Sequence, residues 1–241
     1  GKTTTLYAMV SALDLESTVA VSVEDPVEFH LPLLRQFDVD TDRGFTIFKG
    51  LRTLLRMDPD VLLIGEIRDQ QSAITAARAA LAGRLILATI HAVDAATAIQ
   101  TLHYLSVPYH ILGDCLRLVA AQNLVRRVCI ECAESRPLKD SERELFERHD
   151  LQPPDQVPTA LGCEACNGYG YSGRIGVFET VGVEGDLAHA VGDGAELDEL
   201  RQHIRRSGAP PMLTDALEKV ANGVTTMDEV YQFHWPALEA G

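Results

Sequence analysis

The chain has 241 residues, which is enough for one large domain or two smaller ones. Its composition, with 46% hydrophobic and 23% charged residues, is that of an ordinary soluble protein. The formal net charge of −14 argues against broad nucleic-acid binding, because phosphate contacts require a basic surface. No apolar run approaches the roughly 20 residues that cross a bilayer, and no signal-peptide pattern opens the chain, so a cytoplasmic location is expected.

The chain opens with Gly1-Lys2-Thr3-Thr4-Thr5, and a helix is predicted over residues 6–13. Gly-Lys-Thr at the start of a helix matches the second half of the phosphate-binding loop G-x-x-x-x-G-K-[ST]. In such a loop, backbone N–H groups and the lysine hold the phosphates, and the hydroxyl binds Mg²⁺. The first glycine of the loop and the strand before it are missing, so we expect that the sequence was cut from a longer protein.

Three short apolar runs predict strands that are buried on both faces, as in a parallel sheet. Helical patterns over 44–57 and 70–81 separate them, which is typical of a doubly wound α/β sheet with its site along one edge. The three strands deliver Glu28, Glu66 and His91 to that edge. The runs cover residues 19–23, 61–64 and 85–90.

Other charged residues are found near the predicted edge. Carboxylates close to a phosphate-binding lysine have two uses, since they hold Mg²⁺ through water or orient an attacking water. Glu24, Asp25 and Glu28 fit these uses, and they equally fit a polar strand end. Arg52 and Arg56 lie on one helix face and either are solvated or reach a phosphate in this subunit or a neighbour.

Four of the five cysteines predict a metal site. Cys129-x2-Cys132 and Cys163-x2-Cys166 are paired knuckles, which indicate zinc in a cytosolic chain. Four thiolates complete a tetrahedral shell and leave no open position, so the zinc is expected to be structural. The spacing between the pairs is longer than in a simple zinc ribbon, so a small insertion is expected there. Cys115 is expected to be a buried apolar residue.

Helical periodicity accounts for most of the remaining sequence, both before the first cysteine pair and after the second. We expect three parts: an N-terminally truncated α/β core over 1–125, a zinc-binding subdomain over 126–174 and a small helical subdomain over 175–241. The additional helices are expected over 95–105, 111–125, 197–204 and 212–220, with capping boxes at Ser141-x-x-Glu144 and Thr226-x-x-Glu229.

Taken together, these motifs resemble the ATPases of bacterial type II secretion and type IV pilus assembly, and the resemblance covers essentially the whole chain. Residues 1–8 resemble the end of the family's Walker A motif, and 23–28 resemble its Asp box. Residues 51–69 resemble the Walker B signature, 89–92 the His box, and 170–176 the segment after the second knuckle. The resemblance implies a RecA-like P-loop NTPase core.

Carried over position by position, the resemblance implies a role for each site residue. Glu66 would orient the hydrolytic water, Glu24 and Glu28 would support metal and water, and His91 would sense the γ-phosphate. The implied cofactors are ATP, Mg²⁺ and structural Zn²⁺. The residues expected to contact nucleotide and Mg²⁺ are Gly1, Lys2, Thr3, Thr4, Asp25 and Arg68.

The chain departs from the family pattern at two places. Arg84 occupies the position of a second histidine before the His-box strand, which puts a two-histidine relay in doubt, although a cation there could still meet phosphate. The segment Ile90-His91-Ala92-Val93 replaces Leu-His-Thr-Asn, so the polar neighbours of His91 are lost.

Members of the family are hexameric motors, and those that extend pili or drive secretion carry the tetracysteine module. The resemblance therefore implies a homo-hexamer in the cytoplasm, peripheral to the bacterial inner membrane. Its partner would be the cytoplasmic domain of a secretion or pilus platform protein, with no direct membrane association and no nucleic acid.

The leading hypothesis is the ATP-hydrolysing motor of a type II secretion system, powering pseudopilus assembly and protein export. The alternatives are a type IV pilus extension ATPase and, from another class, a non-hydrolysing assembly or regulatory module. A RecA-like nucleic-acid motor is disfavoured by the charge of −14. Because half of the phosphate loop is missing, residues 1–241 alone are expected to hydrolyse ATP weakly.

Overall fold

The computed structural model describes residues 1–232, which divide into two compact units. The first unit comprises residues 1–119 and 181–207, and the second comprises residues 120–180 and continues from 208. The chain enters the second unit along β5 (Leu118–Val128) and leaves it along β8 (Tyr171–Gly182), and these two strands pair with each other. Each unit is described in turn.

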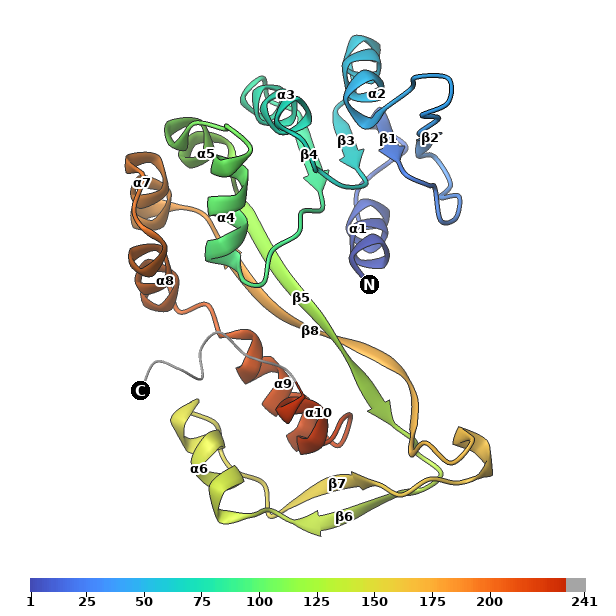
Figure 1. The fold of residues 1–241 in the computed structure, drawn as a ribbon, viewed down its shortest axis with the longest axis vertical. Coiled ribbons are helices and arrows are strands. Elements are labelled where there is room, and N and C mark those ends of the chain that lie inside the picture. The colour runs from blue at the N-terminus through green and yellow to red at the C-terminus, as the bar shows by residue number, and fades with distance from the viewer. Residues whose placement is uncertain (233–241) are drawn as a thin grey trace. The chain divides into compact units, whose positions relative to one another are not determined.

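The first unit is built on a four-stranded sheet in the order β2-β1-β3-β4, with every pair of neighbours parallel (Figure 1). β1 (Ala20–Glu24) and β3 (Val61–Ile64) are central and buried at every position, which explains their continuous apolar runs. β4 (Leu85–Ala88) and β2 (Arg35–Asp38) form the edges. β2 is missing from the predicted elements, because it contains no apolar run and depends on pairing with β1.

Helices cover both faces of this sheet (Figure 1). α1 (Lys2–Ser11) packs on one face, where its apolar side chains join those of β1 and β3 in one core cluster. α2 (Ile47–Leu54) and α3 (Gln70–Leu81) lie on the other face, and α2 continues into the short helix η1 (Leu55–Met57). The predicted doubly wound α/β fold is therefore confirmed for this unit.

Four more helices complete the first unit: α4 (Ala95–Tyr104), α5 (Tyr109–Cys115), α7 (Gly185–Asp193) and α8 (Leu197–Arg206). α5 and α7 pack very closely, because a Cβ on Gly113 would lie 2.8 Å from the carbonyl oxygen of Ala188. Asp94 caps α4, and its carboxylate also accepts from Arg201 of α8, with Nη2 and Oδ2 3.0 Å apart.

The second unit contains an antiparallel pair of strands and three helices: β6 (Ala133–Pro137), β7 (Gln156–Ala160), α6 (Asp140–Arg148), α9 (Met212–Ala221) and α10 (Met227–Tyr231). A further short helix, η2 (Glu164–Cys166), lies in the second cysteine pair. One apolar cluster joins β5, α6, β7, β8, α9 and α10, and its buried members include Val125, Phe146, Val157, Leu213 and Val230.

One stretch that was expected to be helical is a strand, and a second strand lies where the helical subdomain was expected to begin. The helix predicted over 111–125 ends at Cys115 in α5, and β5 starts at Leu118. The start of the predicted helical subdomain is likewise occupied by β8, up to Gly182. The helical prediction for 118–125 is wrong because the partner strand, far along the chain, supplies the backbone hydrogen bonds that decide between the two structures.

The helix predicted between the cysteine pairs exists as α6, but it starts at Asp140, before the start that the Ser141-x-x-Glu144 pattern predicts. The backbone N–H of Lys139 donates to the Glu142 carboxylate at 2.9 Å, so the capping box lies two residues before Ser141 and Glu144. Glu142 is fully buried, and Arg136 binds it with two hydrogen bonds of 2.8 and 2.6 Å. This ion pair between Arg136 of β6 and the buried Glu142 of α6 fixes the start of α6.

The two units also differ from the three expected parts, whose boundaries were expected at residues 125 and 174. α7 and α8, which were assigned to the helical subdomain over 175–241, belong to the first unit. α9 and α10 pack against α6 and β7, so the zinc segment over 126–174 shares its apolar core with them. Residues 233–241 of the expected subdomain lie outside the described part of the chain.

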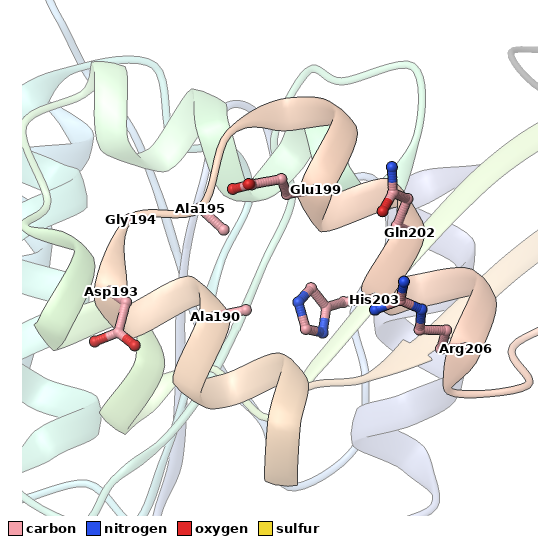
Figure 2. Close-up of a pocket in the computed structure, with 8 residues that line it drawn as sticks. All are labelled: Ala190, Asp193, Gly194, Ala195, Glu199, Gln202, His203 and Arg206. Carbon is pink, nitrogen blue, oxygen red and sulfur yellow. The ribbon is translucent and has the colours of Figure 1, made fainter.

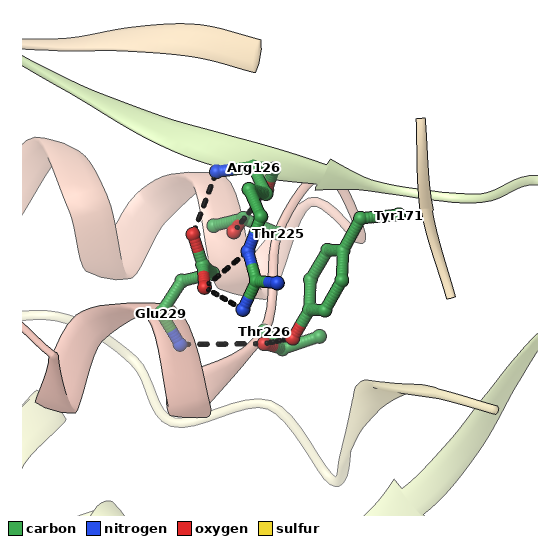
Figure 3. A network of polar contacts seen from close by, with 5 residues as sticks. All are labelled: Arg126, Tyr171, Thr225, Thr226 and Glu229. Carbon is green, nitrogen blue, oxygen red and sulfur yellow. Dashed lines mark hydrogen bonds and ion pairs between the residues drawn. The ribbon is translucent and has the colours of Figure 1, made fainter. Parts of the chain in front are cut away.

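A polar network in the second unit connects β5, β8 and α10 (Figure 3). The side chain of Glu229 is 3% exposed and accepts from the backbone N–H of Arg126 at 2.7 Å and from its Nε and Nη2 at 2.9 and 2.6 Å. The Arg126 guanidinium lies 4.0 Å from the centre of the Tyr171 ring, whose hydroxyl contacts Thr226 Oγ1 at 2.9 Å. Thr226 is the N-cap of α10, as predicted, whereas the Glu229 carboxylate binds Arg126.

We predict that Glu229→Ala lowers the unfolding free energy of the second unit by about 2 to 3 kcal/mol, because it leaves three donors of Arg126 without their acceptor. Urea unfolding measures the loss, and hydrogen exchange of the α10 amides reports on this unit alone. Glu218→Ala, at an exposed position of α9, is the control and is expected to change stability by less than about 0.5 kcal/mol. Equal effects of the two substitutions would contradict the prediction.

Candidate functional site

Glu66 lies directly after β3, on a turn that three local features fix. The Gly65 N–H donates to the carbonyl of Val23 in β1 at 2.9 Å, and a Cβ on Gly65 would lie only 3.2 Å from the Cα of Glu24. Glycine allows this close approach of the turn to β1. At the far end of the turn, Asp69 caps α3 by accepting from the backbone N–H of Ser72 at 2.9 Å.

β4 brings His91 beside Glu66, because the pairing of β3 and β4 continues past the ends of both strands. The Ile67 N–H donates to the Thr89 carbonyl at 2.9 Å, and the Thr89 hydroxyl donates to the Gly65 carbonyl at 2.6 Å. With the two segments held in this register, His91 Nε2 lies 2.5 Å from Glu66 Oε1.

Two cationic side chains also reach the same carboxylate. Lys2 Nζ, at the start of α1, lies 3.6 Å from Glu66 Oε1, and Arg68 Nε donates to Oε2 at 2.5 Å. The Glu66 side chain is 16% exposed, whereas that of His91 is 77% exposed. The structure therefore brings together Lys2, Glu66, Arg68 and His91 from three elements at the carboxyl edge of the sheet, with the cations facing solvent.

The start of α1 suits an anionic ligand. Its N-cap is Gly1, no side chain caps its first turn, and that turn contains no acidic residue. The backbone N–H groups and the helix dipole at this end therefore favour negative charge. Lys2 and Thr3 are partly exposed and Thr4 is exposed, so this end, together with the adjacent carboxylate of Glu66, fits the phosphates of a nucleotide with Mg²⁺.

The acids at the end of β1 and in the loop after it do not join the cluster around Glu66. Glu24 is 1% exposed, and its carboxylate accepts from the hydroxyls of Tyr7 and Ser22 and from Gln36 Nε2. Burial, together with the hydrogen bond to Glu24, raises the pKa of Tyr7 to about 12, so the phenol remains a donor. Asp25 and Glu28 lie exposed in the loop after β1. Sequence reasoning missed the partners Tyr7, Ser22 and Gln36, whose residue types are common and carry no motif.

Arg84 lies at the wrong end of β4 to meet a phosphate. It pairs with Asp58, with Nη2 2.9 Å from Oδ1, at the amino end of the strand. Four strand residues at about 3.3 Å each separate this pair from the carboxyl edge where His91 lies. Arg52 lies 5.7 Å from the centre of the Phe48 ring within α2.

The four knuckle cysteines form a second candidate site. The Sγ atoms of Cys129 and Cys163 are 3.9 Å apart, and Cys166 Sγ lies 3.8 Å from those of Cys132 and Cys163. A tetrahedral zinc with Zn–S bonds of about 2.3 Å requires sulfurs about 3.8 Å apart. All four thiols are free and lie within 4.8 Å of one another, so the group matches a structural zinc site.

The backbone around the second knuckle supports metal binding. Cys166 Sγ accepts from the N–H groups of Cys163 at 3.2 Å and Gly170 at 3.1 Å, and these contacts lower the pKa of Cys166. A lower pKa favours the thiolate, which is the form that binds a metal. Gly162 has φ of +110°, and a Cβ there would lie 2.4 Å from the Gly168 carbonyl oxygen. Only glycine fits this position.

A cavity of about 400 Å³ lies elsewhere in the first unit, between α7 and α8 (Figure 2). Its lining mixes acids, Asp193 and Glu199, with the bases His203 and Arg206, and Figure 2 shows the His203 imidazole between the two helices. It contains none of the predicted site residues, and its mixture of acidic and basic side chains selects no ligand class. Among residues 1–232, no helix has the length and apolarity needed to cross a membrane.

Similar curated proteins are secretion and pilus proteins. The chain is 35% identical over 240 residues to the putative type II secretion system protein E of Escherichia coli K12, covering 100% of this chain and 48% of that protein. It is 37% identical to type II secretion system protein E of Aeromonas hydrophila, covering 95% and 46%. It is 36% identical to the type IV pilus assembly ATPase PilB of Thermus thermophilus, covering 95% and 26%. The chain thus spans about half the length of these secretion proteins.

Solved structures confirm the fold class. The pilus retraction motor PilT with bound ADP superposes with a TM-score of 0.70 at 20% identity, covering 96% of this chain and 57% of that chain. The Legionella pneumophila ATPase DotB gives a TM-score of 0.63 at 17% identity, covering 91% of this chain and 52% of that chain.

A sequence profile described as "Type II/IV secretion system protein" matches residues 1–232. The chain therefore belongs to the type II/IV secretion system protein family, as its motifs predict.

Proposed function

We propose that this chain is the catalytic part of an ATP-hydrolysing motor that powers pseudopilus assembly and protein export in a bacterial type II secretion system. The observation that supports it most is the meeting of Lys2, Glu66 and His91, which come from α1, β3 and β4, at one edge of a parallel sheet. That edge is where open α/β sheets bind their ligands. The family and the similarity to secretion proteins E agree with this proposal.

In this proposal each residue has a defined task. Lys2 and the N–H groups at the start of α1 hold the phosphates, and Thr3 and Thr4 provide hydroxyls beside them. Bound Mg²⁺ would neutralise phosphate charge, as in other phosphoryl-transfer sites. Glu66 orients the attacking water and accepts its proton, while His91 and Arg68 hold the Glu66 carboxylate in place.

The four knuckle cysteines are assigned a structural Zn²⁺ in this proposal. Four thiolates would occupy every position of the tetrahedron and leave none for substrate. The metal would tie the segment between β5 and β6, which carries Cys129 and Cys132, to the loop between β7 and β8, which carries Cys163 and Cys166.

The assembly is proposed from the same family. We expect a homo-hexamer at the cytoplasmic face of the inner membrane, held there by the cytoplasmic domain of a platform protein. A type IV pilus extension motor is the second candidate. The chain is about as similar to two type IV pilus assembly ATPases, at 35% and 36% identity, as to type II secretion system protein E of Aeromonas hydrophila, at 37%. The cysteine knuckles suit both extension and secretion motors, so exported substrates distinguish the two.

We predict that Glu66→Gln in the natural full-length protein lowers kcat for ATP hydrolysis by at least about 100-fold while ATP still binds, because the amide cannot accept the proton of water. A phosphate-release assay measures the rate. Glu16→Gln, at an exposed position after α1, is the control and should keep the wild-type rate. A wild-type rate in Glu66→Gln would remove this residue from catalysis. If the wild-type full-length protein binds ATP without hydrolysing it, the non-hydrolysing module is supported.

We predict about one zinc ion per chain in metal analysis of protein purified under reducing conditions. Cys163→Ser should abolish the zinc and increase hydrogen exchange over residues 126–170, since one ligand of four is lost. Cys115→Ser, outside the cluster, is the control and should retain the zinc. Four free thiols without metal in the wild type would refute the site.

A further inference from the structure

A buried polar cluster beneath α1 has no role in the mechanism above. Its centre is the carboxylate of Glu24, which accepts from the hydroxyl of Tyr7, from Ser22 Oγ at 2.5 Å and from Gln36 Nε2 at 3.2 Å. Since successive residues of a strand face opposite sides, Ser22 and Glu24 share the face of β1 that α1 covers. The cluster thus joins α1, β1 and β2.

The same cluster also holds the acidic loop. Gln36 Nε2 lies 3.1 Å from the carbonyl of Phe29, and its Oε1 accepts from the Leu31 N–H at 2.7 Å. The Phe29 ring packs edge-on against Tyr7, with 4.6 Å between ring centres. Phe29 directly follows Glu28, so the loop that carries Asp25 and Glu28 is attached to α1 through Tyr7 and Gln36.

Directional contacts matter here because the core cluster that α1 forms with the sheet is largely apolar. Leu6 and Val10 of α1 pack against Val61 and Leu63 of β3, and such contacts fix a helix on a sheet without fixing its position along its own axis. The hydrogen bond from Tyr7 to Glu24 restricts that position, since a small shift of α1 would take this donor away from a buried carboxylate. Tyr7 is four residues from Thr3, on the same side of α1, so the restriction extends to the phosphate-binding end.

We propose that Tyr7, Glu24 and Gln36 are positioning residues that lock the phosphate-binding helix α1 to the acidic loop over 25–31, so that Lys2 and Glu28 keep one relative placement. The inference rests on the proposed function for its consequence in nucleotide binding. In this proposal the Glu24 carboxylate positions α1 through Tyr7, whereas its motif predicts that it supports the metal.

The experiment compares Tyr7→Phe, Glu24→Gln and their double variant in the natural full-length protein, with a fluorescent ADP analogue as probe. Each variant should weaken nucleotide binding about tenfold, which corresponds to one hydrogen bond to a charged group. The double variant should bind nucleotide no more weakly than the worse single variant, because both changes disrupt the same Tyr7–Glu24 contact. The kcat at saturating ATP and the Mg²⁺ concentration for half-maximal rate should stay within about twofold of wild type.

Other outcomes overturn the proposal. If Glu24→Gln raises the Mg²⁺ requirement and Tyr7→Phe does not, Glu24 supports the metal directly. Additive losses in the double variant, or no loss in Tyr7→Phe, would show that the contact does not position α1.

Hydrogen exchange of the nucleotide-free protein tests the lock independently of the proposed function. Tyr7→Phe should speed exchange in both α1 and residues 25–31, whereas Tyr104→Phe, at an exposed position of α4, should change neither segment. Faster exchange in α1 alone would overturn the coupling. Failure of the ATPase proposal would appear separately, as wild-type protein that binds no nucleotide.

Discussion

The parallel register between β3 and β4 is the constraint on which the candidate site depends. Val61 lies opposite Leu85 and Ile64 opposite Ala88, and the pairing continues through Ile67 and Thr89. Because the strands run in the same direction, their carboxyl ends meet at one edge. A shift of the register by one residue would turn the side chains that follow to the other side of the sheet and separate His91 from Glu66.

The Glu66 carboxylate lies beside two cations, Lys2 and Arg68, and beside the imidazole of His91. The same cations suit the phosphates of a nucleotide. In the proposed site, phosphate and the Glu66 carboxylate would therefore compete for Lys2, and the carboxylate would become available to water once that lysine bound phosphate.

The acid that resembles Glu66 in the sequence is used in a different way. Glu24 also follows an apolar strand and a motif identifies it equally well, but it is buried and bound by Tyr7, Ser22 and Gln36. The difference comes from strand parity and from α1, since Glu24 ends β1 on the face that this helix covers. A motif names the acidic residues near a site, and packing decides which of them face solvent and ligand.

The sequence by itself determined the buried strands β1 and β3, the helix over 70–81 and the cluster of four cysteines, because local periodicity and ligand spacing specify these features. It placed the start of the first helix at residue 6, whereas α1 starts at Lys2, and it predicted burial on both faces for β4, which is a partly exposed edge strand. Only the tertiary structure decided that residues 118–125 form a strand and that Arg84 pairs with Asp58. It also decided that α7 and α8 belong to the first unit. Each of these depends on a partner distant in sequence, and local pattern contains no information about such a partner.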